Sequence, residues 1–350
     1  MDYKNHYSLR EWIELGRKDV LDLFSSEEYG FIPKELDIPL RYEVAEEKYT
    51  DTIHIRKVLM FYKNYPMRFY LYVPKGRKHN KTFIMVMHEY AENLADKDLV
   101  NNYQSFYKYA DIDNIISRGY AIALVATREV YPDKKYSHRN SILKAAGIRK
   151  KSNTAGALRL WAWACSKVLD YLYTLGDEID TSKVAVIGHS RGGKTALIAA
   201  SYDERFVLSV SSCSGNSGAA LSRNNTGETI ADINKNFPFW FSKKYRNYSH
   251  NEDKLPFDQH QLIGLIAPRY VYVFSASEDS WACPKNELLS CRYASDYFKL
   301  YGLEGLAAPQ QIKNDVSYSQ GHIAYHMKTG SHSLEMRDWN MVMDYFDKIN

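Results

Sequence analysis

The chain has 350 residues, of which 45% are hydrophobic and 25% are charged, and its formal net charge is +4. This length suits one large α/β domain or a domain with insertions, and so small a net charge argues against a nucleic-acid partner. No stretch is apolar enough to span a membrane, and no secretory leader is visible at the start. We therefore expect no membrane association and a cytoplasmic protein, or a secreted or periplasmic one if a signal peptide has been removed.

The first part of the chain, about 1–75, is predicted to be a helical and β-stranded extension of a single domain spanning 1–350. Apolar residues at helical spacing predict a helix over 8–30. Three β-like stretches follow and are expected as antiparallel strands at one sheet edge, at 38–44, 52–61 and 67–73, with Tyr65 and Pro66 as the turn between the last two.

From residue 83 onward, strand and helix patterns alternate, which predicts a mostly parallel central sheet in a three-layer α/β sandwich. Strands are expected at 83–87, 120–125, 206–212, 270–275 and 322–326, and helices at 103–117, 154–173, 286–300 and 335–349. The stretch from about 213 to 260 is polar and aromatic and is too long for a plain loop. We expect it to carry short helices and to roof the site.

The segment that organises the chain is a strand, a turn and a helix over 183–201, with the pattern G-x-S-x-G centred on Ser190. This pattern is typical of a nucleophile elbow, in which a serine sits on a strained turn between a buried strand and a helix. Side chains at Gly188 or Gly192 would collide with neighbouring backbone. The turn would raise the Ser190 hydroxyl above the sheet and place the next backbone N–H at the helix N-terminus, where negative charge is stabilised.

Two other strand ends carry the residues that a serine nucleophile needs. A serine hydroxyl reacts only when a base takes its proton, and the base needs a carboxylate to fix its tautomer. We predict His332 as the base and Asp279 as the acid, with the adjacent Glu278 as the alternative acid. His326 lies within the last predicted strand and is expected to be a packed residue.

Several segments make residues 8–345 resemble the glucuronoyl esterases and their bacterial relatives, carbohydrate esterase family 15. The matching segments are GHSRGGK at 188–194, SGNSGAA at 214–220, NED at 251–253, DQH at 258–260, APR at 267–269 and DSWACPK at 279–285. The serine-Arg-x-Gly-Lys pattern is far more specific than the generic elbow. The resemblance implies that Arg191 helps to stabilise the oxyanion and that Lys194, Glu228 and Trp281 line the sugar site.

Each of these residues also has a structural alternative. A permanently charged Arg191 could form a structural salt bridge, Lys194 could be buried in a pair with Glu228, and Trp281 could belong to the core. The chain also departs from the family pattern. Cys213 stands where many members carry the catalytic Glu, so the acid must come from Glu278 or Asp279. His189 stands where the family often has Cys, and we expect it to pack against the sheet.

These observations predict a serine carboxylic-ester hydrolase of the α/β-hydrolase fold, with no cofactor and no metal. The expected substrates are 4-O-methyl-glucuronoyl or other glucuronate esters in glucuronoxylan or lignin-carbohydrate fragments, and the expected state is a monomer. Two other functions remain open. One is an acetyl-xylan or other small-acyl esterase, and the other is a catalytically silent carbohydrate-binding relative.

Overall fold

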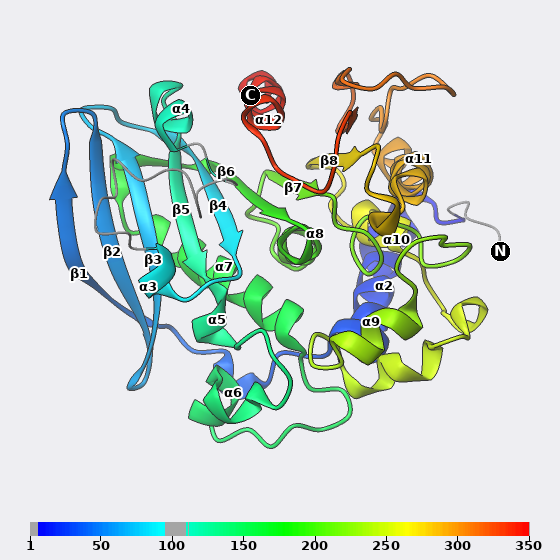
Figure 1. Cartoon of the computed structure of the whole chain (residues 1–350), viewed down its shortest axis with the longest axis horizontal. Coiled ribbons are helices and arrows are strands. Elements are labelled where there is room, and N and C mark those ends of the chain that lie inside the picture. The colour runs from blue at the N-terminus through cyan, green and yellow to red at the C-terminus, as the bar shows by residue number, and fades with distance from the viewer. Residues whose placement is uncertain (1–5, 95–109, 111, 350) are drawn as a thin grey trace.

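A computed structural model describes residues 6–94, 110 and 112–349 of the chain. Its centre is a nine-stranded sheet in the order β1-β2-β3-β5-β4-β6-β7-β8-β9 (Figure 1). The strands from β5 to β9 run parallel, and β1, β2 and β3 form the antiparallel edge that the sequence predicts. Their bounds are β1 Arg41–Tyr49, β2 Ile53–Tyr62, β3 Tyr65–Pro74, β4 Asn80–Met87, β5 Ala121–Ala126, β6 Ile179–His189, β7 Leu208–Ser212, β8 Tyr270–Ala276 and β9 Ile323–Lys328.

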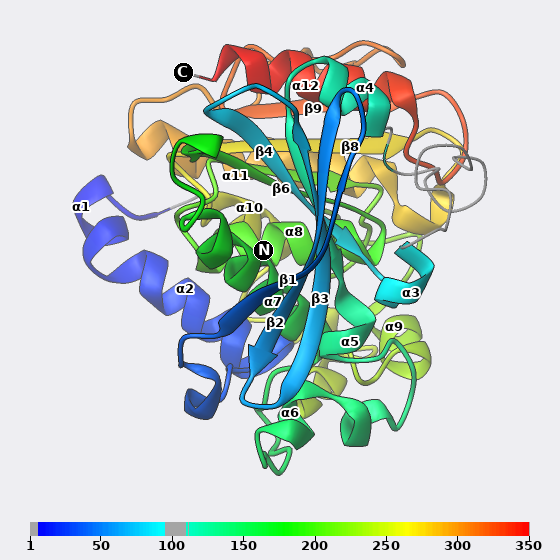
Figure 2. The ribbon, with the colours of Figure 1, turned by 90° about the vertical axis from the view of Figure 1, so that its left-hand side faces the viewer.

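The central strands are apolar on both faces, because helices cover both sides of the sheet. Along β4, Phe83 and Met85 belong to one buried cluster, whereas Ile84 and Val86 belong to the other. The first cluster is closed by α4, Ile112–Ser117, and α12, Met336–Lys348, which lie together at the top of Figure 2. This arrangement confirms the predicted three-layer α/β-hydrolase architecture.

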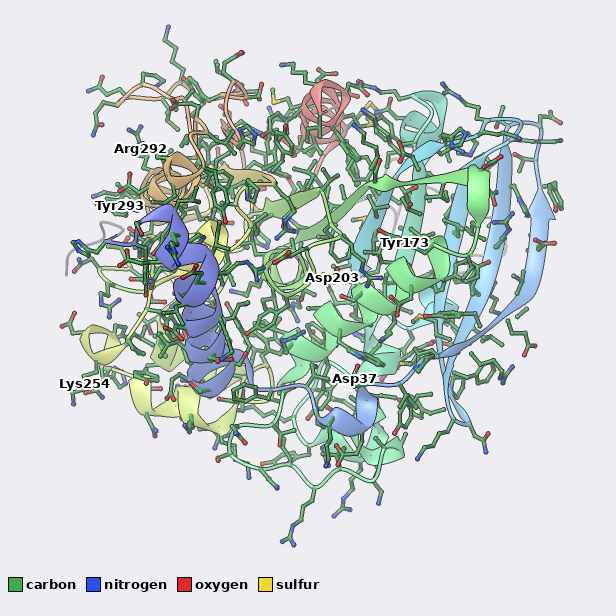
Figure 3. The ribbon with its side chains drawn as sticks, turned by 180° about the vertical axis from the view of Figure 1, so that it is seen from behind. Asp37, Tyr173, Asp203, Lys254, Arg292 and Tyr293 are labelled. Carbon is green, nitrogen blue, oxygen red and sulfur yellow. The ribbon has the colours of Figure 1, made fainter. Side chains whose placement is uncertain are left out.

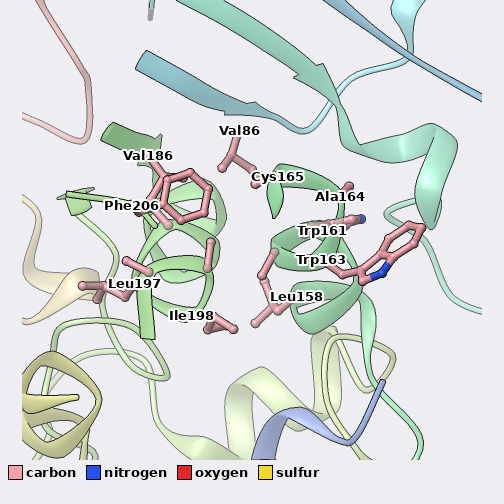
Figure 4. Packing of buried hydrophobic residues seen from close by; sticks show 14 of the residues in the cluster. Val86, Leu158, Trp161, Trp163, Ala164, Cys165, Val186, Leu197, Ile198 and Phe206 are labelled. Carbon is pink, nitrogen blue, oxygen red and sulfur yellow. The ribbon is translucent and has the colours of Figure 1, made fainter. Parts of the chain in front are cut away.

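The second cluster contains the helix of the predicted elbow. There α8, Arg191–Tyr202, packs beside α7, Ala157–Leu172, through buried side chains that include Trp161 and Leu197 (Figure 4). Tyr173 and Asp203 mark the ends of these two helices in the view from behind (Figure 3). The same side carries α10, Gln259–Gly264, α11, Pro284–Leu300, and the N-terminal helical run.

The N-terminal run is nearly continuous from residue 9 to residue 29, close to the predicted helix. Two stretches in it have π-helical geometry, η1 at Trp12–Gly16 and η2 at Phe24–Tyr29. They alternate with two α-helical stretches, α1 at Leu9–Glu11 and α2 at Arg17–Leu23. Shorter helices elsewhere are α3 Ala91–Leu94, α5 Thr127–Val130, α6 Ile142–Ala145, α9 Ile230–Asn236, η3 Lys34–Leu36, η5 Ser137–Asn140, η6 Gly176–Glu178, η7 Lys243–Tyr248, η8 Glu252–Lys254 and η9 Ser280–Ala282.

One predicted turn is wrong. Tyr65 and Pro66 belong to β3, and the hairpin turns two residues earlier, where Lys63 takes a positive φ of 53°. Pro66 is tolerated because β3 pairs with β5 only from Phe69 to Tyr72, so its missing N–H costs no hydrogen bond on that side. Of the helix expected over 103–117, residues 103–109 and 111 lie outside the described residues.

The stretch 213–260 carries the short helices that the sequence predicts, α9, η7 and η8. All four cysteines are buried and free, so no disulfide joins Cys283 to Cys291. Among the described residues, no helix combines the length and the apolar character needed to cross a bilayer.

Candidate active site

Ser190 sits at the junction of β6 and α8 in a strained conformation, with φ 57° and ψ −123°. The glycines around it are required by close approach. A Cβ added to Gly188 would lie 2.2 Å from the backbone of Gly192, and one added to Gly192 would lie 3.1 Å from the carbonyl oxygen of Val86. The turn is held by the Ser190 N–H, which donates to the Ser212 carbonyl at 2.8 Å. The chain thus has the geometry of a nucleophile elbow.

The loops after β8 and β9 bring an acid and a histidine together. Asp279 Oδ2 lies 2.5 Å from His332 Nδ1, and the Asp279 side chain is only 6% exposed whereas that of His332 is 43% exposed. Asp279 Oδ1 also accepts from the Ala282 N–H at 3.3 Å, which fixes the carboxylate. Glu278 is exposed. Of the two carboxylates considered from the sequence, Asp279 is therefore the one that contacts His332.

All seven predicted site residues line one cavity of about 370 Å³. They come from α8, from the loops after β8 and β9, and from the stretch 213–260. The lining comprises Ser190, Arg191, Lys194, Cys213, Ser214, Gly215, Glu228, Phe237, Trp240, Asp279, Trp281, Ala282 and His332.

Arg191 forms a short salt bridge with Asp133, so the structural alternative for this residue is present. The buried Asp133 carboxylate also accepts from Trp240 Nε1 at 2.8 Å. The guanidinium lies over two rings of the pocket wall, 5.4 Å from Phe237 and 5.0 Å from Trp240. Its Nε is buried and has no partner among the described residues. Arg191 is therefore held at the cavity wall with its Nε–H donor unused.

Lys194 and Glu228 form the buried pair that the sequence offered as an alternative, with Lys194 Nζ 3.3 Å from Glu228 Oε2. The Lys194 ammonium also donates to the Asn216 carbonyl. Both residues still line the cavity. Trp281 is 54% exposed, so it is not a core residue, and its carbonyl accepts from the Glu228 N–H at 2.8 Å.

Burial disfavours the charged form of two histidines near the site, His88 and His189. Burial and then the positive charge of Arg191 lower the pKa of His88 to about 4. Burial, followed by the nearby His332, holds the pKa of His189 well below its usual value. The His189 ring packs 4.4 Å from the His332 ring and its Nδ1 lies 2.8 Å from Ser212 Oγ.

Cys213 is also part of the site. Its Sγ and ligand atoms of Asp279 and His332 all lie within 4.8 Å of one another. Burial, and then the charge of Glu287, raise the pKa of the thiol, so it stays protonated at neutral pH. A side chain at position 213 thus reaches the acid–histidine pair, although the thiol itself offers no carboxylate.

Three residue groups near the cavity were not predicted. Asp133 lies in a polar loop with no motif, and Phe237 with Trp240 lies in an aromatic stretch without periodicity. Glu287 is fully buried on α11 and accepts from Ser275 Oγ at 2.6 Å and from the Gly215 N–H at 2.9 Å. Burial raises the pKa of Glu287 to about 7. A charged residue at a helical position gives no sequence signal that its side chain turns inward.

Comparison with known proteins identifies the family. The profile of the fungal glucuronyl esterases matches residues 106–302, more than half of the chain. Carbohydrate esterase MZ0003, from an unknown prokaryotic organism, is 40% identical over 242 residues, which are 67% of this chain and 55% of that protein. The aligned part thus spans about half the length of this curated relative.

Two solved structures match over nearly the whole chain. A glucuronoyl esterase from Solibacter usitatus is 27% identical with a TM-score of 0.88 and covers 97% of this chain and 94% of that one. A promiscuous CE15 esterase from the marine bacterial metagenome is 30% identical with a TM-score of 0.85 and covers 97% and 93%. With this elbow, this acid–histidine pair and these matches, the chain belongs to the glucuronoyl esterases of carbohydrate esterase family 15.

Proposed function

We propose that the protein is a serine carboxylic-ester hydrolase that cleaves esters of glucuronic acid. Ser190 attacks the ester carbonyl while His332 takes the hydroxyl proton, and Asp279 holds the His332 ring and stabilises the imidazolium that forms. His332 then returns the proton to the departing alcohol. Water, deprotonated by His332, attacks the acyl-enzyme; His332 then returns this proton to the Ser190 oxygen as the glucuronic acid is released.

The negative charge that develops on the carbonyl oxygen needs donors already in place. The backbone N–H groups of Arg191 and Gly192 open α8, and the first N–H groups of an α-helix lack acceptors four residues earlier within the helix. The Arg191 side chain supplies a fixed positive charge, because Asp133 and the two aromatic rings restrict its position. We assign oxyanion stabilisation to these groups.

We assign sugar binding to Lys194, Glu228 and Trp281. The Lys194–Glu228 pair presents a charged donor and a charged acceptor at the cavity wall, which suits vicinal hydroxyl groups. The half-exposed Trp281 offers an apolar ring face to a pyranose. The ester carboxyl is neutral in the substrate, so no strongly basic pocket is needed.

The observation that carries the proposal is the single cavity that holds both the elbow serine and the Asp279–His332 pair beside a charged, aromatic wall. The relatives matched by the profile are described as glucuronyl esterases, which supports this substrate class. The marine relative is described as promiscuous, and this favours keeping a small-acyl esterase activity as the second candidate.

A substrate comparison separates the two. We expect a higher kcat/KM for a glucuronate methyl ester than for p-nitrophenyl acetate, because only the uronate can use the remote wall to lower the barrier. Equal or reversed values would make the small-acyl esterase the better assignment. No turnover of either ester would leave the carbohydrate-binding relative. The monomeric state and the cytoplasmic location stay predictions from the sequence.

A further inference from the structure

A strongly basic segment lies next to the candidate active site. Residues 134–151 contain seven lysine or arginine residues and no acidic residue, so the rest of the chain carries a formal charge of −3. Six of these cations are exposed: Lys134, Lys135, Arg139, Lys144, Arg149 and Lys151. None of the seven forms an ion pair with a described residue, although the ion pairs of Arg128 and Lys167 flank the segment on both sides in sequence. The segment's charge is therefore not neutralised within the described part of the protein.

The segment lines one groove and part of a second groove that adjoins it. One, of about 540 Å³, is lined by His138, Arg139, Lys144, Gly147, Ile148 and Arg149. The other, of about 360 Å³, is also lined by Gly147, Ile148 and Arg149. The rest of its lining comes from residues 31–35 and from Lys151, Asn153 and Thr154. Among the described residues that line the two grooves, Glu35 is the single acidic one. We call residues 134–151 with these grooves the basic face; it lies around α6 at the foot of Figure 1.

A second segment adds to the same charge. The Lys243 N–H donates to the Ser152 carbonyl at 2.8 Å, which fixes the start of η7 against the end of the basic segment. Burial, followed by the charges of Lys243 and Arg246, lowers the pKa of Lys150 to about 8. Neighbouring cations make the charged form of each lysine less favourable, and a bound anion would relieve this repulsion.

Two aromatic side chains stand exposed on this face. Tyr136 is 95% exposed between the cations, and Phe31 is 40% exposed at the second groove. An exposed aromatic ring offers an apolar surface on which a pyranose ring can stack. The basic face thus offers both cations and aromatic rings, which suit an anionic polymer of sugars.

The basic segment begins beside the active-site wall. Asp133, directly before the segment, holds Arg191, and Trp240, three residues before Lys243, lines the cavity. The Asp133 carboxylate is occupied by Arg191 and Trp240, so it does not neutralise its neighbours. The ligand must therefore be a polymer long enough to reach from the cavity to the basic face.

We propose that the basic face binds the free carboxylates of an acidic polysaccharide, whose esterified uronate enters the cavity. The inference rests on the proposed function, which makes an uncharged uronate ester the reacting group. Unesterified uronates elsewhere on the same polymer would then be the anions that reach the basic face. Their binding raises the local concentration of ester at Ser190 without touching the reacting atoms.

The test uses the full chain and two double variants that remove equal charge. Lys144→Gln with Arg149→Gln empties the first groove of two cations, and Lys75→Gln with Lys78→Gln removes two exposed cations from the loop before β4, at the far end of the sheet. Binding of glucuronoxylan oligosaccharides with unesterified 4-O-methyl-glucuronate is measured beside neutral xylo-oligosaccharides of the same length. We expect the groove variant to raise the Kd for the acidic oligosaccharide about tenfold at low salt, and the control variant to leave it unchanged.

Further outcomes decide the assignment. Tyr136→Ala should also weaken acidic oligosaccharide binding, and 1 M salt should abolish the difference between wild type and groove variant, because the Debye length is then about 3 Å. The groove variant should retain wild-type kcat/KM on a small glucuronate methyl ester. Equal Kd values for wild type and groove variant would overturn the inference while leaving that turnover, and so the proposed function, intact. Equally tight binding of a single-stranded oligonucleotide of the same charge would overturn the polysaccharide assignment.

Discussion

Asp279→Asn changes the acid of the proposed triad by one atom. In the structure Asp279 Oδ2 lies 2.5 Å from His332 Nδ1, so the carboxylate accepts the ring N–H and leaves the other ring nitrogen free to take a proton from Ser190. An amide at this place can present its NH₂ group and stabilise the wrong tautomer. We expect kcat to fall about 10⁴-fold, equivalent to about 5.5 kcal/mol of activation free energy, with little change in KM.

The assay is steady-state hydrolysis of a glucuronate methyl ester, with circular dichroism to check folding. Glu278→Gln is the matched control, since it removes the neighbouring exposed charge, and it should reduce kcat by less than about threefold. Cys213→Glu in the Asp279→Asn background should recover part of the loss, because position 213 reaches His332. A larger loss from Glu278→Gln than from Asp279→Asn would refute the assignment of the acid.

Three further predictions concern stability and are measured by urea unfolding. Gly188→Ala should prevent folding or lower the free energy of unfolding severely, because the added Cβ would lie 2.2 Å from the Gly192 backbone. Gly302 has a positive φ but open space around it, so Gly302→Ala should lower the free energy of unfolding by only about 1 kcal/mol. Similar losses in the two variants would contradict this explanation. Lys194→Met should cost about 3–5 kcal/mol by leaving a buried Glu228 unpaired, and adding Glu228→Gln should recover much of it; purely additive losses would mean that the pair is not coupled. Burial raises the pKa of Glu287 from 4.5 to about 7, so between these pH values the folded protein holds a proton that the unfolded chain has lost. Stability should therefore fall by up to about 3 kcal/mol as pH rises through this window, and Glu287→Gln should flatten the slope; an unchanged slope would place the titration elsewhere.

Much of the fold follows from local patterns that the sequence carries openly. The apolar run before Ser190, the alternation of strands and helices and the spacing of α7 predict the layers, because parallel strands must be covered on both faces. The turn at Lys63 was missed because a lysine with positive φ has no local signature, whereas Pro66 resembles a turn residue. The proline favours a turn at Tyr65 and Pro66, whereas the pairing of β2 with β3 places the turn at Lys63.

The candidate site divides in the same way. That Ser190, Asp279 and His332 lie close together can be predicted from the topology, since the carboxyl ends of parallel strands meet at one edge of the sheet. Asp133 could not be predicted as the partner of Arg191, because it comes from a loop distant in sequence. Only the packed structure brings its carboxylate to both Arg191 and Trp240. The inward turn of Glu287 likewise depends on the loop at Gly215 and on β8.

The most direct test of the account is the mass of the protein after reaction with a fluorophosphonate probe, followed by localisation of the label by peptide mapping. We expect one covalent adduct per chain, on the Ser190 hydroxyl, and none on a folded Ser190→Ala variant, which should also lose ester turnover by about 10⁴-fold or more. A label on another residue, or a Ser190→Ala variant that still labels or still hydrolyses glucuronate esters, would contradict Ser190 as the nucleophile.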